Sequence, residues 1–166
     1  MQLLLFRHGI AESQGPDATD ASRRLTYEGV EKTRRAARGL ARFLEAPSVI
    51  LTSPLTRALQ TADIIAGELG ANVQTWRLLA HHEPEAILRE IAPRDEASIM
   101  LVGHEPTLST IVALLCGADR DARIVPFKKA GCAQLELESG HPSPPRGRLI
   151  WLATPEILRL LGGAED

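Results

Sequence analysis

The sequence has little of what marks several large classes of protein. It contains only two cysteines, Cys116 and Cys132, which are too far apart for a CxxC pair and too few for a four-ligand zinc site. Its 19 lysines and arginines against 21 acidic residues give a net charge of -2, so it has no overall basic surface for nucleic acid or an anionic membrane. No apolar run approaches the roughly 20 residues of a membrane span.

These absences also indicate the cellular compartment in which the protein is found. Residues 1–7 lack the basic start of a signal peptide and reach a charge too early for one. Both cysteines are interpreted as small hydrophobic residues in a reducing compartment. We therefore expect a cytoplasmic protein that binds neither nucleic acid nor membrane.

What is present is typical of a globular domain. The chain has 166 residues, of which 44% are hydrophobic and 24% charged. A domain has roughly 150 residues, and this length buries a core without disulfides or a metal. The sequence thus predicts a single domain over residues 1–166.

Short apolar runs alternate with segments of helical periodicity. Strands are predicted at residues 3–6, 49–52, 72–75, 99–102, 132–137 and 148–152, the last two around a turn at 140–145. Helices are predicted to start at Thr26, at Pro54 with Ser53 as N-cap, and at Pro84, Pro106 and Pro155. Repeated strand–helix units favour an α/β fold, with a mainly parallel sheet between two helical layers.

The residues that carry chemistry follow the strands. Arg7, His8 and Gly9 follow the first strand, Ser53 the second, His81 and His82 the third, and Gly103 and His104 the fourth. Parallel strands open onto one edge of the sheet, and Arg57, one helical turn after Ser53, faces the same edge. Imidazoles, guanidiniums and two helix N-termini would gather there, which predicts a site for an anion such as phosphate.

Four segments resemble motifs of one family. Leu5–Gly9 resembles the RHG signature of the histidine phosphatase superfamily, which includes the cofactor-dependent phosphoglycerate mutases. Leu25–Gly29 resembles its LTxxG helix start, Ser53–Ala62 its SPxxRAxQTA segment and Leu101–Pro106 its second histidine motif. The resemblance runs from Gln2 to about Leu115, and the short chain without a cap insertion is most similar to SixA-type phosphohistidine phosphatases.

The resemblance implies a mechanism. His8 would attack phosphorus and carry the phosphoryl group as a covalent intermediate that water removes. Arg7 and Arg57 would clamp the phosphoryl oxygens, and His104 would complete the pocket. Gly9 would let the backbone approach and turn its carbonyl to the His8 ring. Such a reaction rests on positioning and electrostatics, so we expect no metal and no cofactor.

Contacts with substrate are expected from further residues near the same edge. These are Gly9, Ser53 and His81, together with four residues of the loop after His8 that could border the site: Asp17, Asp20, Arg23 and Arg24.

The sequence departs from the family where many members carry a glutamate as general acid. The stretch Leu78–Pro84 offers only Glu83, beside a helix start, and His81. A phosphohistidine substrate needs no strong acid, because its leaving imidazole is protonated readily, unlike an alkoxide. The missing glutamate therefore favours phosphohistidine on a protein, for example a phosphotransfer domain, as the substrate.

Alternatives stay open. A small-molecule phosphomonoesterase uses the same residues on a small phosphorylated substrate, and a non-catalytic module would bind phosphate or a phosphoprotein without turnover. Mutase activity is disfavoured because a short chain has little to close over the site. A metal site from His81, His82 and Glu83 with His8 and His104 is disfavoured because adjacent histidines seldom share a metal.

Overall fold

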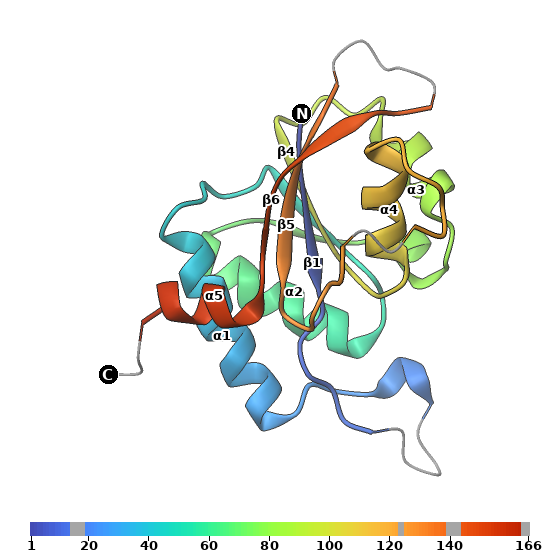
Figure 1. The fold of residues 1–166 in the computed structure, drawn as a ribbon. Coiled ribbons are helices and arrows are strands. Elements are labelled where there is room, and N and C mark those ends of the chain that lie inside the picture. Colours follow the sequence, from blue (N-terminus) through green and yellow to red (C-terminus); the bar gives the residue numbers. More distant parts are fainter. Residues whose placement is uncertain (14–18, 123–124, 139–143, 164–166) are drawn as a thin grey trace.

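All six predicted strands belong to one sheet with helices on both faces (Figure 1). The computed structural model describes residues 1–13, 19–122, 125–138 and 144–163. The elements in chain order are β1 Gln2–Arg7, η1 Asp20–Ser22, α1 Tyr27–Ala41, β2 Val49–Thr52, α2 Thr56–Leu69, β3 Val73–Thr75, η2 Arg77–Ala80, α3 Pro84–Ile91, β4 Ser98–Gly103, α4 Thr107–Leu115, β5 Cys132–Leu137, β6 Gly147–Ala153 and α5 Pro155–Leu161. Most of the turn expected at 140–145 lies outside the described residues.

The sheet is mixed, with the order β3-β2-β4-β1-β5-β6. The first four strands in this order are parallel, whereas β5 pairs antiparallel with both β1 and β6. The α/β class is confirmed, and the last two strands add the antiparallel part.

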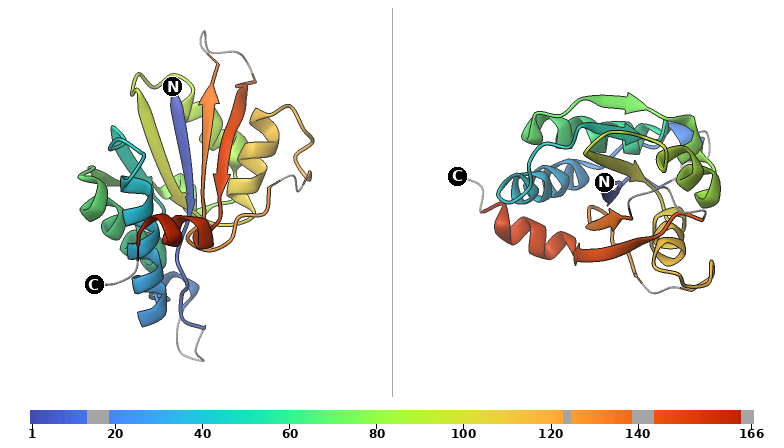
Figure 2. Two further views of the ribbon diagram at one scale, coloured as in Figure 1. Left: turned by 60° about the vertical axis from the view of Figure 1, so that its left-hand side comes forward. Right: turned by 90° about the horizontal axis from the view of Figure 1, so that it is seen from above.

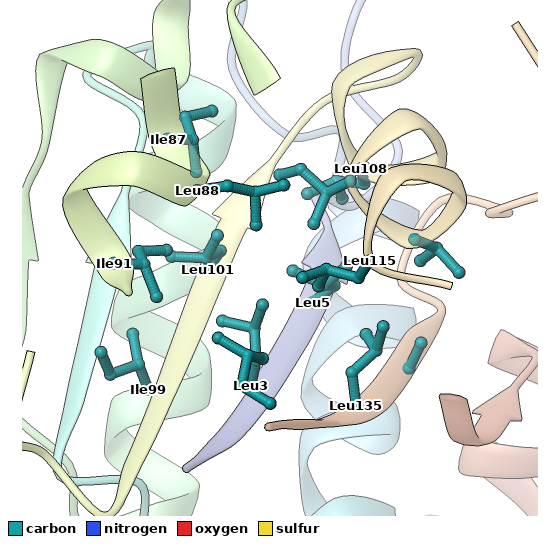
Figure 3. Close-up of a cluster of buried hydrophobic side chains, with 14 of the residues drawn as sticks. Leu3, Leu5, Ile87, Leu88, Ile91, Ile99, Leu101, Leu108, Leu115 and Leu135 are labelled. Atoms are coloured by element: carbon teal, nitrogen blue, oxygen red, sulfur yellow. The ribbon is translucent and has the colours of Figure 1, made fainter. Parts of the chain in front are cut away.

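β1 lies at the centre of the sheet and has side chains in both layers of the core. Leu3 and Leu5 point to the face covered by α3 and α4, where they pack with Ile87 and Leu108 (Figure 3). Leu4 and Phe6 point to the face covered by α1, α2 and α5 (Figure 2). This strict alternation makes β1 a strand buried on both sides, as its continuous apolar run predicts.

Two of the helix ends follow the predicted chemistry. Thr26 Oγ1 accepts a hydrogen bond from the Gly29 amide at 2.9 Å and caps α1. Gly70 ends α2 with φ 72°, a left-handed conformation that favours glycine. None of the helices in the described part of the chain combines the length and apolar character needed to cross a bilayer.

The predicted start of the second helix is wrong. α2 begins at Thr56 with Leu55 as its N-cap residue, two residues later than Pro54. Ser53 is not the N-cap residue, but its hydroxyl accepts a hydrogen bond from the Leu55 amide at 3.4 Å and also lies 2.9 Å from His104 Nε2. The side chain predicted to cap the helix therefore belongs to the predicted site as well.

Candidate active site

The register of three parallel strands places the predicted site residues side by side. Arg7 is level with Gly103, and Thr52 is level with Val102. Just beyond these pairs, the His8 amide donates to the Gly103 carbonyl at 3.1 Å, and the Ser53 amide to the Val102 carbonyl at 3.1 Å. His8, Ser53 and His104 therefore leave the same edge of the sheet, as predicted.

The His8 ring is held in one orientation by a contact at each nitrogen. Nδ1 lies 2.8 Å from the Gly9 carbonyl oxygen, and Arg57 Nε donates to Nε2 at 3.3 Å. A carbonyl only accepts hydrogen bonds and a guanidinium only donates them, which assigns the proton to Nδ1 and the lone pair to Nε2. His8 thus presents Nε2 as the nucleophilic atom, toward Arg57.

Burial keeps both histidines of the cluster neutral. Loss of water lowers the pKa of His8 to about 3, assisted by His104, Arg57 and Arg7 and opposed by the bond to Gly9. The pKa of His104 falls to about 4, mainly through burial and then through Arg57 and Arg7, while Asp20 opposes the shift. The two ring centroids are 4.9 Å apart. A neutral imidazole keeps the lone pair that a nucleophile needs.

Gly9 occupies a place with no room for a side chain. A Cβ atom there would lie 2.3 Å from Thr33 Oγ1 and 3.3 Å from the Gly29 carbonyl oxygen. The Gly9 amide donates to Thr61 Oγ1 at 3.0 Å, and that hydroxyl donates to the Arg57 carbonyl at 2.7 Å. These bonds connect the segment after β1 to the first turn of α2, which carries Arg57.

Arg57 is nearly fully buried and has all three of its nitrogens occupied. Besides Nε on His8, NH1 donates to the Asp20 carbonyl oxygen at 2.7 Å and NH2 to Asp20 Oδ2 at 2.9 Å. Bonds from Arg23 and Arg57 lower the pKa of the Asp20 carboxyl, so Asp20 is an anion here. The Asp20 carboxylate binds the guanidinium in the way that a phosphoryl group would.

Arg7 directly precedes His8 at the end of β1. Its NH1 donates to the Phe127 carbonyl oxygen at 2.6 Å, and its Nε is buried without a hydrogen-bond partner among the described residues. Burial lowers the pKa of Arg7, and the negative charge of Glu105 opposes this shift. The arginine is therefore held by a backbone carbonyl, which leaves its Nε available to a ligand.

The structure brings some of the predicted substrate contacts to the cluster and leaves others outside. Gly9 and Ser53 are part of it, and Arg23 is linked indirectly, because its NH1 lies 2.8 Å from Asp20 Oδ1. Arg24 is exposed. Asp17 lies outside the described residues.

The two candidates for a general acid also lie apart from the four central residues. His81 and Glu83 are exposed, and Glu83 makes no capping bond to α3. Among the described residues, no hydrogen bond or ion pair joins either side chain to His8, Arg7, Arg57 or His104.

Two acidic residues have a larger place in the site than the sequence indicated. Asp20 binds Arg57, although its place in the sequence indicated only one of four possible substrate contacts in the same loop. The charge of Glu105 reaches Arg7, although the Leu101–Pro106 motif indicated no role for this residue. Its position directly after His104 was the available signal. No three histidine, cysteine or acidic side chains in the described part of the chain are grouped to hold a metal ion.

Comparisons with known proteins agree on one family. The family model of the histidine phosphatase superfamily, branch 1, matches residues 3–83. An uncharacterized protein of Picosynechococcus sp. PCC 7002 is 41% identical over 118 residues, covering 65% of this chain and 68% of that protein. The phosphohistidine phosphatase SixA of Escherichia coli K12 is 27% identical over 168 residues, covering 96% of this chain and 98% of SixA.

A solved structure extends the similarity over nearly the whole fold. The crystal structure of the protein histidine phosphatase SixA complexed with tungstate superimposes with a TM-score of 0.78 at 25% identity. The superposition covers 95% of this chain and 99% of the other.

Proposed function

Because the chain belongs to the histidine phosphatase superfamily and is on that ground a phosphatase, we propose that it hydrolyses phosphohistidine on a protein, with His8 as the nucleophile. The observation that carries the proposal is the fixed, neutral His8 ring, with Nδ1 bonded to Gly9 and Nε2 in contact with Arg57. A nucleophile, cationic clamps and a second imidazole are what phosphoryl transfer requires.

In the first step, His8 Nε2 attacks the phosphorus atom and the bond to the substrate nitrogen breaks. The electron pair of that bond goes to the leaving imidazole, and the phosphoryl group passes to His8. The phosphorylated ring then carries a positive charge. Its Nδ1 keeps the proton and donates it in a hydrogen bond to the Gly9 carbonyl oxygen, which stabilises that charge. Arg57 and Arg7 bind the phosphoryl oxygens.

In the second step, a water molecule attacks the phosphorus and releases inorganic phosphate. The electron pair of the broken bond returns to Nε2, which restores the neutral His8 ring. The SixA relatives favour a protein substrate over a small ester.

The proposal is tested by comparing phosphate release by the wild type and His8→Ala. Each is offered a phosphohistidine protein and a panel of small phosphomonoesters. We expect release from the protein substrate that is lost in the variant, and a labelled, acid-labile phosphoenzyme that forms only in the wild type. Equal melting temperatures would show that the variant is folded.

The other outcomes separate the alternatives. Release mainly from small esters would make the protein a metabolite phosphatase. Phosphate-dependent binding without release from any substrate would identify a binding module, and undiminished activity of His8→Ala would refute the mechanism.

The proposed setting is the cytoplasm. Cys116 and Cys132 are both free, and burial raises the pKa of the Cys132 thiol, which keeps it in the unreactive protonated form. This is the chemistry expected of cysteines in a reducing compartment.

A further inference from the structure

We propose that a cleft beside Arg7 and His104 holds the leaving group of the substrate and that Glu105 keeps a proton on that group, so the site selects phosphoryl groups linked to nitrogen. The proposal rests on the proposed function and names its substrate class more closely.

The cleft has a volume of about 760 Å³ and lies at the start of α4. Two of its lining residues are connected directly to the cluster. Glu105 follows His104 in the chain, and the Phe127 carbonyl accepts the bond from Arg7 NH1. The cleft therefore adjoins Arg7 and His104, where a group attached to a bound phosphoryl would extend.

The two carboxylate oxygens of Glu105 differ in their bonding. Oε2 accepts a hydrogen bond from Ser109 Oγ at 2.5 Å, which fixes the side chain. Oε1 is buried and has no hydrogen-bond partner in the described part of the chain. Buried acceptors without a donor are rare and costly, because desolvation is not compensated. An unused, oriented acceptor on the wall of a cleft indicates a ligand that brings the donor.

The neighbouring charges favour a cationic donor. Glu105 and Asp121 both line the cleft, while the guanidinium of Arg120, also on its wall, is paired with Glu85. His82 is the imidazole at this cleft, with Nδ1 3.0 Å from Thr107 Oγ1. The cleft thus offers carboxylates whose charge a bound cation would balance.

A phosphorylated imidazole supplies such a donor. Its ring nitrogen remote from phosphorus carries a proton, and in this protonated form the ring is positively charged. When the bond between phosphorus and nitrogen breaks, the electron pair neutralises the ring, which leaves as imidazole with its remote proton still in place. A hydrogen bond from that proton to Glu105 Oε1 favours the protonated form before cleavage. The leaving group of an ester carries no such N–H, so a hydrogen bond to Glu105 does not assist its departure.

The test compares Glu105→Gln with the wild type on a phosphohistidine protein and on p-nitrophenyl phosphate, whose leaving group departs without a proton. We expect kcat for phosphohistidine to fall roughly fivefold or more, because the neutral amide oxygen accepts a weaker hydrogen bond than the carboxylate. The rate on p-nitrophenyl phosphate should stay within roughly twofold. Glu68→Gln, on α2 over the opposite face of the sheet, makes the same change of charge and should alter neither rate.

The ratio of the two rates distinguishes the proposal from a structural role. Equal losses on both substrates would show that Glu105 only positions Arg7, and unchanged rates on both would show that it has no role; either result overturns the proposal. A wild type that hydrolyses only the ester would refute the proposed function itself, and this inference with it.

Discussion

At the scale of single residues, Arg57 shows what a substrate must displace. Its guanidinium is bonded to His8 and, through two nitrogens, to Asp20. One of the Asp20 contacts uses the backbone carbonyl and the other the carboxylate. A phosphoryl group that binds NH2 has to replace that carboxylate, so Asp20 and the substrate compete for the same donor.

Substituting Asp20→Asn should therefore tighten the binding of inorganic phosphate. The backbone bond to Arg57 NH1 remains, while a negative charge beside the phosphoryl site is lost. Two charges about 4 Å apart near water interact by about 1 kcal/mol, so we expect a decrease of roughly fivefold in the inhibition constant of phosphate. Asp95→Asn, just before the opposite ends of the strands, should leave that constant unchanged. Weaker phosphate binding in Asp20→Asn would instead assign Asp20 the role of orienting Arg57.

At the scale of elements, the start of α1 supports the segment that follows β1. A Cβ atom on Gly29 would lie 2.0 Å from the Ile10 carbonyl oxygen, and the Thr26 amide donates to the same oxygen at 3.0 Å. The first turn of α1 is therefore in direct contact with the backbone next to Gly9. The position of the His8 ring depends on how closely this helix approaches.

Two glycine-to-alanine substitutions in helices should have opposite effects. Gly29→Ala introduces the clash with Ile10 and should destabilise the protein by about 2 kcal/mol, with a loss of activity. Gly67→Ala, in α2 with open space around the added atom, should stabilise it by about 0.5–1 kcal/mol. Urea denaturation of both variants measures the two effects. An unchanged free energy of unfolding in Gly29→Ala would mean that α1 can shift against the segment after β1.

The same elements show where sequence reasoning succeeds. Every predicted strand and helix is present, because continuous apolar runs and proline starts are local signals, and the family inferred from four motifs is confirmed. The order of the strands is not local, and neither is the contact that one hydroxyl makes with a distant residue. Ser53 is a good helix cap by its sequence, but its contact with His104 involves a residue from another strand.

The same distinction applies to the site. Residues that directly follow β1, β2 and β4 converge because strand register determines their position. His81 follows β3 only after the short helix η2, and that intervening turn leaves it exposed. Asp20 reaches Arg57 from a connecting segment without apolar periodicity, so only the folded chain reveals the pair.

At the scale of the whole molecule, the two buried histidines connect function with stability. The pKa values of His8 and His104 are about 3 and about 4 in the folded protein, against 6.5 in the unfolded chain. Between these limits the unfolded chain binds protons that the folded protein does not. The stability that the two neutral histidines contribute is complete above pH 6.5 and is lost as the pH falls toward 4.

The free energy of unfolding should accordingly decrease on acidification from pH 6.5 to about 5, before the carboxylates titrate. Each histidine contributes up to about 1.4 kcal/mol per pH unit. Denaturant titrations at several pH values in phosphate-free buffer measure the slope, which should be about half as steep in His8→Asn. A slope that the substitution leaves unaltered would show that His8 titrates alike in the folded and the unfolded protein, which contradicts the lowered pKa.

The central position of β1 also has a consequence for how the chain is made. β1 is translated before both of its neighbours in the sheet, which are residues 98–103 and 132–137. On the ribosome, one edge of the strand stays unpaired until β4 emerges and the other until β5 emerges. The nascent chain therefore cannot assemble the edge that carries the candidate site piece by piece, and His8 reaches its final surroundings only after β5 has been synthesised.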